Sequence, residues 1–247
     1  YIDIDKQPSR ARQHQIQTYG TVVFEYQDRV ERVVANTEQD LTNALIKAIE
    51  GTERTVYFVQ GHDEKNVRSA ERDGYNTIGN ALELDNFFVE TLVLAQQTEV
   101  PADASMLIIA GPRTDLLESE IETLQQYLER GGKVLFLMDP SAELEPAQQA
   151  NIRTLLSQWG VTLGDDIVFD GSAMGQLLGT DASMPVAADY PSHPITDRFN
   201  VLTAFPLARS VEPTPGETSN LVAEAFLQTG NQSWAETDIA RLTETGE

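Results

Sequence analysis

Imidazole and carboxylate groups follow one another directly in the segment FVQGHDEKN at residues 58–66. His62, Asp63 and Glu64 come after a hydrophobic run that is typical of a buried strand. Side chains of these types can bind a divalent cation or move protons. Three consecutive residues do not all face one ion, however, and the segment has neither a His-x-His nor a His-Glu-x-x-His spacing. A solvated polar loop is therefore the alternative to a catalytic or metal-binding site.

A second histidine has a restricted backbone. His193 lies between two prolines in YPSHPIT at residues 190–196, and prolines favour extended conformations around it. This setting suits a fixed contact, and His193 could meet His62 across the strand ends with Asp189 or Asp139 nearby. A rigid surface turn with a hydrogen-bonded histidine is the simpler interpretation.

Polar residues also follow two other strand-like runs. Arg113 lies in GPRT at 111–114, between an expected strand and an expected helix, where backbone N–H groups can hold an anion. Pro112 removes one of these donors, so a capped helix start is the plainer interpretation. Asp139 follows the run KVLFLM. Ligands of open α/β sheets bind at the carboxyl ends of the strands, which makes the following residues ligand- or partner-binding candidates: His62, Asp63, Glu64, Arg113, Asp139 and His193.

The sequence offers no evident nucleophile. It contains no cysteine, which excludes disulfides, thiolate metal sites and cysteine nucleophiles. The segment GSAMG at 171–175 differs from Gly-x-Ser-x-Gly because Ser172 directly follows the first glycine. Neither a P-loop nor a Gly-x-Gly-x-x-Gly pattern is present. We therefore expect a chain that is not an enzyme and has no cofactor.

The charge balance narrows the classes of partner. The 247 residues include 39 Asp and Glu against 17 Lys and Arg, a net charge of −22 at pH 7. Such a surface repels phosphate backbones and anionic lipid head groups, so we expect no nucleic-acid partner. No apolar run approaches the roughly 18 residues of a membrane span. The chain begins at Tyr1 without Met or a signal peptide, and we expect it to be a piece of a longer protein.

The elements that must position these groups change in period along the chain. Residues 1–5 alternate like a strand, residues 8–18 fit a short polar helix, and residues 20–34 fit a β-hairpin. A helix is expected from Thr37, its N-cap, to Gly51, with an apolar face of Leu41, Leu45, Ala48 and Ile49.

Strands and helices then alternate. Strands are expected at 54–60, 90–94, 106–110 and 133–138, and helices at 77–88, 115–130 and 148–159. Asp115 and Glu118 fit a capping box for the second of these helices. This order predicts an α/β fold: a mostly parallel sheet with helices on both faces, in three layers. Further strands are expected within 161–170, 201–212 and 220–227.

Several segments together resemble a known family. They are TYGTVVFEYQDRVERV at 18–33, QDLTNAL at 39–45, VYFVQGHDE at 56–64, ASMLIIAGPRTDLLESEIETLQQYLERGGKVLFLMDP at 104–140 and HPIT at 193–196. This set is similar to the extracytoplasmic region of the gliding-motility-type ABC transporter auxiliary component family, over residues 18–240. The family's strand usually ends in Gly-His-Gly-Glu, and here Asp63 replaces the second glycine.

The resemblance implies a location, partners and a domain layout. It implies a periplasmic domain of a membrane-anchored protein, anchored by segments outside this chain, that works with an ABC permease and ATPase and with a glycan or peptide cargo. Residues 1–36 resemble the end of a thioredoxin-like domain. Residues 37–247 resemble a glutamine amidotransferase-like or flavodoxin-like domain, related to one in intraflagellar-transport proteins.

Three functions remain open from the sequence. Because the cysteine nucleophile of amidotransferases is missing, the resemblance implies a non-enzymatic auxiliary domain. The first alternative is a metal-dependent hydrolase or a small-ligand-binding protein that uses His62, Glu64 and His193. The second is a purely structural spacer.

Overall fold

The computed structural model describes residues 2–35, 37–51, 54–140, 149–172, 181–187, 190–214 and 221–238. The chain divides into two compact units. The first unit consists of residues 1–58, 66–91 and 101–106, and the second of residues 59–65, 92–100 and 107–247. No helix in the described parts of the chain is long and apolar enough to cross a membrane.

The first unit begins with a helix and a hairpin. Helix α1 spans Pro8–Gln13, and strands β1 (Thr21–Tyr26) and β2 (Arg29–Val34) pair antiparallel with Tyr26 opposite Arg29. The expected hairpin is therefore confirmed. The expected strand at 1–5 is wrong over its described residues, because the Asp3 carboxylate accepts the backbone N–H groups of Asp5 and Lys6 and bends the chain into a turn.

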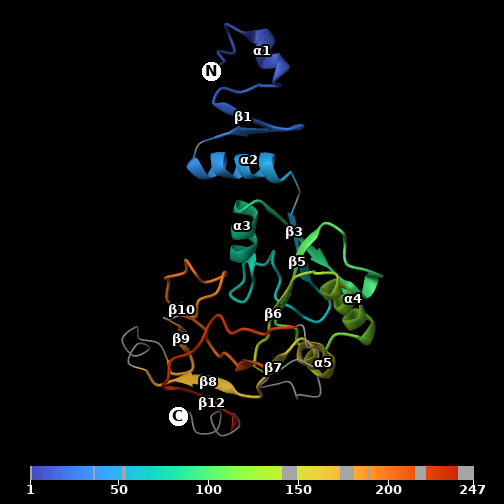
Figure 1. Ribbon diagram of the computed structural model, residues 1–247, viewed down its shortest axis with the longest axis vertical. Coiled ribbons are helices and arrows are strands. Elements are labelled where there is room, and N and C mark those ends of the chain that lie inside the picture. Colours follow the sequence, from blue (N-terminus) through green and yellow to red (C-terminus); the bar gives the residue numbers. More distant parts are fainter. Residues whose placement is uncertain are drawn as a thin grey trace. The chain divides into compact units, whose positions relative to one another are not determined.

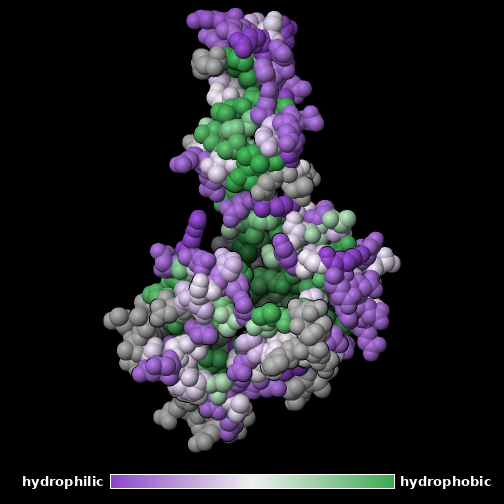
Figure 2. Space-filling model, in the orientation of Figure 1, coloured by the Kyte–Doolittle hydropathy of each residue, from purple (hydrophilic) through white to green (hydrophobic). Residues whose placement is uncertain are grey.

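Helix α2 packs against this hairpin (Figure 1). It spans Glu38–Glu50, starts at a capping box formed by Thr37 and Asp40, and ends at Gly51 in the left-handed conformation. Both expected ends are confirmed. The expected apolar face is only partly covered, because Ala48 is fully buried whereas Leu45 and Ile49 are 43% and 46% exposed. Figure 2 shows hydrophobic residues gathered over the hairpin and α2.

The central sheet has four parallel strands in the order β4-β3-β5-β6. They are β3 (Arg54–Val59), β4 (Phe87–Leu92), β5 (Ala104–Ala110) and β6 (Val134–Leu137). In the second unit, β5 and β6 align with Leu107 opposite Val134. The parallel α/β sheet predicted from the sequence is confirmed.

Helices flank the sheet. They are α3 (Asn76–Leu84), α4 (Glu118–Glu129) and α5 (Ala150–Gln158), and a short 3-10 helix, η1, spans Leu94–Gln96. In the second unit α4 packs against α5 and η1. The helix expected at 77–88 ends earlier, because Asn86 has a φ of 63° and Phe87 already belongs to β4.

The rest of the second unit consists of short antiparallel pairs. Strands β7 (Val161–Leu163) and β11 (Val211–Pro213) pair, as do β9 (Val186–Ala187) and β10 (Thr203–Ala204). Strand β8 (Ile167–Asp170) pairs with β12 (Ser233–Glu236), near the end of the described chain (Figure 1). The strand expected at 220–227 is wrong over its described residues 221–227, and β9 and β12 were not anticipated.

Candidate functional site at the strand ends

The loop after β3 buries the imidazole of His62 between two carboxylates. His62 Nδ1 lies 3.3 Å from Glu64 Oε1, and His62 Nε2 lies 2.9 Å from Glu120 Oε2. The other oxygen of Glu64 accepts the backbone N–H of His62 at 2.7 Å. His62, Glu64 and Glu120 are only 8%, 7% and 1% exposed. We call these three residues the imidazole–carboxylate cluster.

Asp63 separates the two buried residues of the loop. Its φ of 59° is left-handed, which is rare for a residue other than glycine but more frequent for Asp and Asn. This turn lets the side chains of His62 and Glu64 both point inward while Asp63 stays exposed. Of the three candidate residues in this loop, only Asp63 is exposed as the solvated-loop alternative requires.

Glu120 is the member of the cluster that the sequence did not reveal. It lies in the first turn of α4, where its Oε2 also accepts the backbone N–H of Leu117 at 2.8 Å. Its Oε1 is buried and has no hydrogen-bond partner among the described residues. The available signal was its position three residues after Leu117, the N-cap residue of the helix.

The capping box expected from Asp115 and Glu118 is wrong. Helix α4 begins later, at Glu118, and the Asp115 carboxylate serves another helix. Its two oxygens accept the backbone N–H groups of Asn151 at 2.7 Å and Ile152 at 3.2 Å, in the first turn of α5. Asp115 thus satisfies donors that α5 leaves unpaired at its own start.

The geometry of the cluster does not favour a metal ion. The two ring nitrogens point in opposite directions, and each faces a different carboxylate, so the three side chains do not converge on one point. Across the described parts of the chain, no group of three His, Cys, Asp or Glu residues is placed to hold a metal. A buried imidazole whose two nitrogens are both occupied also has no free nitrogen with which to activate a nucleophile.

Arg113 and Asp139 lie near the cluster. Arg113 contacts it through its backbone, whereas Asp139 approaches Gly111 with its side chain. The backbone N–H of Arg113 donates to His62 O at 2.8 Å, and its side chain is exposed. Gly111 has a φ of 61°, and a Cβ there would lie 2.8 Å from Asp139 Oδ2. The left-handed φ favours glycine at position 111, and the missing Cβ leaves room for the Asp139 carboxylate at the end of β5.

The backbone of Asp139 is tied to the rest of the second unit by a buried guanidinium. Arg209 donates from Nη1 to Asp139 O and to Gln149 Oε1, both at 3.2 Å, and from Nε to Gly164 O at 2.8 Å. Burial lowers the pKa of Arg209, and the neighbouring charge of Arg153 lowers it further. Arg209 therefore fixes the chain at the end of β6.

His193 has its own surroundings. Its Nδ1 accepts the backbone N–H of Ile195 at 3.2 Å, and its ring lies 5.4 Å from the ring of Phe226. Its Nε2 is 3.9 Å from Glu224. These contacts describe a turn held by a hydrogen-bonded histidine, and no contact with His62 occurs among the described residues. Of the segment at 171–175, residues 173–175 lie outside the described residues.

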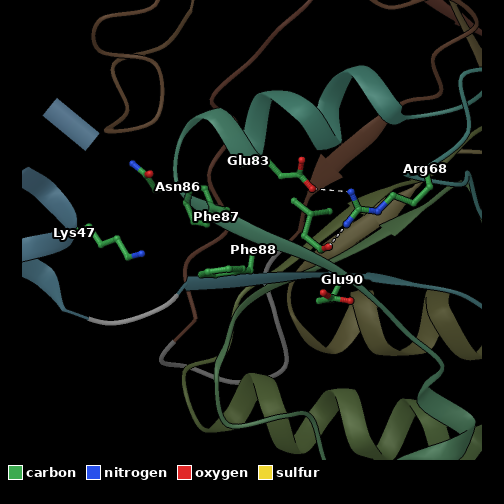
Figure 3. Close-up of a pocket in the computed structure, with 8 residues that line it drawn as sticks. Lys47, Arg68, Glu83, Asn86, Phe87, Phe88 and Glu90 are labelled. Carbon is green, nitrogen blue, oxygen red and sulfur yellow. Dashed lines mark hydrogen bonds and ion pairs between the residues drawn. The ribbon is translucent and has the colours of Figure 1, made fainter. Parts of the chain in front are cut away.

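A pocket of about 330 Å³ in the first unit was not predicted from the sequence (Figure 3). Arg68 is part of its wall, with Nη1 2.6 Å from Glu83 Oε1 and Nη2 2.5 Å from Val89 O on β4. Because β4 is at the edge of the sheet, Arg68 occupies a carbonyl that an added strand would need. The pocket is lined by Lys47, Arg68, Glu83, Asn86, Phe87, Phe88, Val89 and Glu90.

The fold places the chain in a recognisable structural class. It is similar to a solved structure named mmIFT52 N-terminal domain, with a TM-score of 0.55 and 18% identity, over 72% of this chain and 74% of that chain. The mouse (Mus musculus) intraflagellar transport protein 52 homolog is 28% identical over 95 residues, which are 38% of this chain and 22% of the mouse protein. The chain thus matches about a fifth of that relative's length.

The chain belongs to the family described as ABC-type uncharacterized transport system, whose model matches residues 53–245. It is therefore an auxiliary component of an ABC-type transport system. The similarity to transporter auxiliary components and to an intraflagellar-transport domain, expected from the sequence, is confirmed.

Proposed function

We propose that this chain is a non-catalytic interaction domain of an ABC-type transport system of the gliding-motility kind. It lies outside the cytoplasm in a protein anchored to the membrane by segments outside the 247 residues. It associates with the permease–ATPase complex and contacts that complex, or a glycan or peptide cargo, through the strand-end edge. We define this edge by its exposed residues Asp63, Arg113 and Asp139.

The closed imidazole–carboxylate cluster is the observation that carries the non-catalytic part of this proposal. The only histidine at the strand ends in the described residues has both ring nitrogens within 3.3 Å of a buried carboxylate oxygen. The sequence also contains no cysteine that could attack a carbonyl. The family membership of residues 53–245 supports the role in transport.

A hydrolysis screen tests the non-catalytic part. The purified chain is incubated with ester, amide and glycoside substrates, alone and with Zn²⁺, Mn²⁺ or Ca²⁺. We expect no hydrolysis that depends on His62, and no rise in melting temperature with metal, because a ligand that binds only the folded state would raise it. The variants His62→Ala and His193→Ala are compared with the unmodified chain. Hydrolysis that is lost in a folded His62→Ala or His193→Ala chain would contradict the proposal.

A further inference from the structure

The geometry of the imidazole–carboxylate cluster determines how many protons the ring of His62 must carry. Carboxylate oxygens accept hydrogen bonds, so each ring nitrogen that faces one must carry a hydrogen. His62 faces Glu64 with Nδ1 and Glu120 with Nε2, at 3.3 and 2.9 Å. Only the doubly protonated imidazolium can donate to both carboxylates. A neutral ring would leave one nitrogen lone pair against a carboxylate oxygen.

We propose that His62 is a proton-dependent latch on the strand-end loop. With both nitrogens protonated, it fastens the loop at residues 61–65 to the first turn of α4. When one proton leaves, one buried carboxylate loses its partner and the loop opens locally. The latch goes beyond the proposed function, because it is a property of the chain alone and makes the exposed edge at Asp63 and Arg113 responsive to pH.

The two carboxylates depend strongly on the imidazolium. Both oxygens of Glu64 contact His62, one through the ring and one through the backbone N–H. The Oε2 of Glu120 has the N–H of Leu117 as its other donor, and its Oε1 has none among the described residues. A buried charge that loses its partner is strongly destabilised. The other charged residues of the surrounding loops are Asp63, Lys65, Arg113, Asp115 and Asp139.

The direction of the response follows from this proton count. The latch is closed at lower pH, where the ring is doubly protonated, and opens as the pH rises and the ring loses a proton. Two amides report on it directly, since Arg113 N–H donates to His62 O and Leu117 N–H donates to Glu120 Oε2, both at 2.8 Å. The amide of Leu107, which donates to Lys133 O between β5 and β6 at 2.9 Å, is an internal reference.

Amide hydrogen exchange of the 247-residue chain, followed by NMR between about pH 6 and pH 9, tests the latch. We expect the protection factors of Arg113 and Leu117 to fall about tenfold over this range, as the loss of a charged hydrogen bond predicts, while that of Leu107 stays constant. Glu120→Gln removes the response, because the amide of Gln can donate to a neutral ring. His193→Gln keeps the response of the unmodified chain.

Ring ¹⁵N shifts provide the second measurement. In the same pH series we expect both nitrogens of His62 to be protonated wherever the amides of Arg113 and Leu117 are protected, with the signals assigned by their loss in His62→Gln. A ring with a single proton while these amides are still protected would overturn the latch. The same pH response in the unmodified chain and in Glu120→Gln would also overturn it. If Glu120→Gln does not fold, Glu64→Gln replaces it, with the same expected loss of the pH response. Neither result bears on the hydrolysis screen, so the two proposals can fail separately.

Discussion

At the scale of single residues, His62 and Glu64 are buried in a segment whose composition is that of a solvated loop. The left-handed backbone at Asp63 turns both inward, and Glu120 reaches them from α4. Burying an ion costs several kcal/mol unless a close partner and further hydrogen bonds offset it. The three side chains therefore stabilise the strand end only as a set, in which His62 lies within hydrogen-bond distance of both carboxylates.

Asp115 provides a residue-scale prediction. Asp115→Ala removes the acceptor of two N–H groups in the first turn of α5. We expect the free energy of unfolding to fall by about 1 kcal/mol or somewhat more, the typical cost of a lost N-cap. Urea denaturation measures this change.

The matched control is Glu118→Ala, since Glu118 is exposed at the start of α4. Its removal should cost only a few tenths of a kcal/mol, the order of one interaction with the helix dipole. Equal losses in the two variants would show that Asp115 does not cap α5.

At the scale of elements, local signals predicted the boundaries that local chemistry sets. Thr37 and Gly51 delimit α2 as expected, since capping and left-handed termination depend on neighbouring residues alone. The boundary between α3 and β4 was misplaced because Phe87 and Phe88 fit a helical apolar face as well as a strand. Strand β12 was missed because its pairing with β8 depends on residues distant in sequence.

The candidate site shows the same limit. His62 and Glu64 were found from their position after a strand, and the expectation of a strand end there is correct. Glu120 could not be distinguished from the other acidic residues of an amphipathic helix, because the sequence does not show which of them faces a loop. An approach of His193 to His62 was one interpretation of the sequence, and the simpler one was a turn with a hydrogen-bonded histidine; the observed contacts with Ile195, Glu224 and Phe226 fit that turn.

The junction of β8 and β9 provides an element-scale prediction with a defined pH dependence. Asp170 accepts the backbone N–H groups of Ser172 at 2.8 Å and Val186 at 3.4 Å. Burial alone raises the pKa of Asp170, but the hydrogen bonds from Ser172 and Val186 outweigh it and the pKa is lowered. A carboxyl group whose pKa is lower in the folded state contributes stability above its unfolded pKa, and this is lost as the pH falls through the folded pKa.

Asp170→Asn should therefore be less stable than the unmodified chain by about 1 kcal/mol at pH 7. This difference should shrink below about pH 4, where the carboxyl group of the unmodified chain becomes protonated. Denaturation series at several pH values measure it, with the exposed Asp63→Asn as a comparison. A difference that stays constant down to pH 2 would refute the assigned role of Asp170.

At the scale of the whole molecule, the net charge of −22 disfavours two classes of partner, and the family membership supports the proposed association with a transport complex. Acidic surfaces disfavour nucleic acids and anionic lipids, whereas association with a transport complex needs only a complementary protein surface. Arg113 gives the edge an exposed cation, and Asp63 and Asp139 are exposed as well. A charge reversal there should disturb binding without opening the buried cluster, since Arg113 contacts His62 through its backbone.

The most direct test of the proposed function is co-purification of the full-length protein with the permease and ATPase that the proposal assigns to it. We expect Arg113→Glu to reduce the recovered complex by roughly tenfold, the order of a misplaced charge at an interface. Lys133→Glu, at the opposite end of the sheet just before β6, should leave recovery unchanged. If the unmodified chain, Arg113→Glu and Lys133→Glu all recover the same amount of complex, the strand-end edge is not the interaction surface. That result would favour a structural spacer.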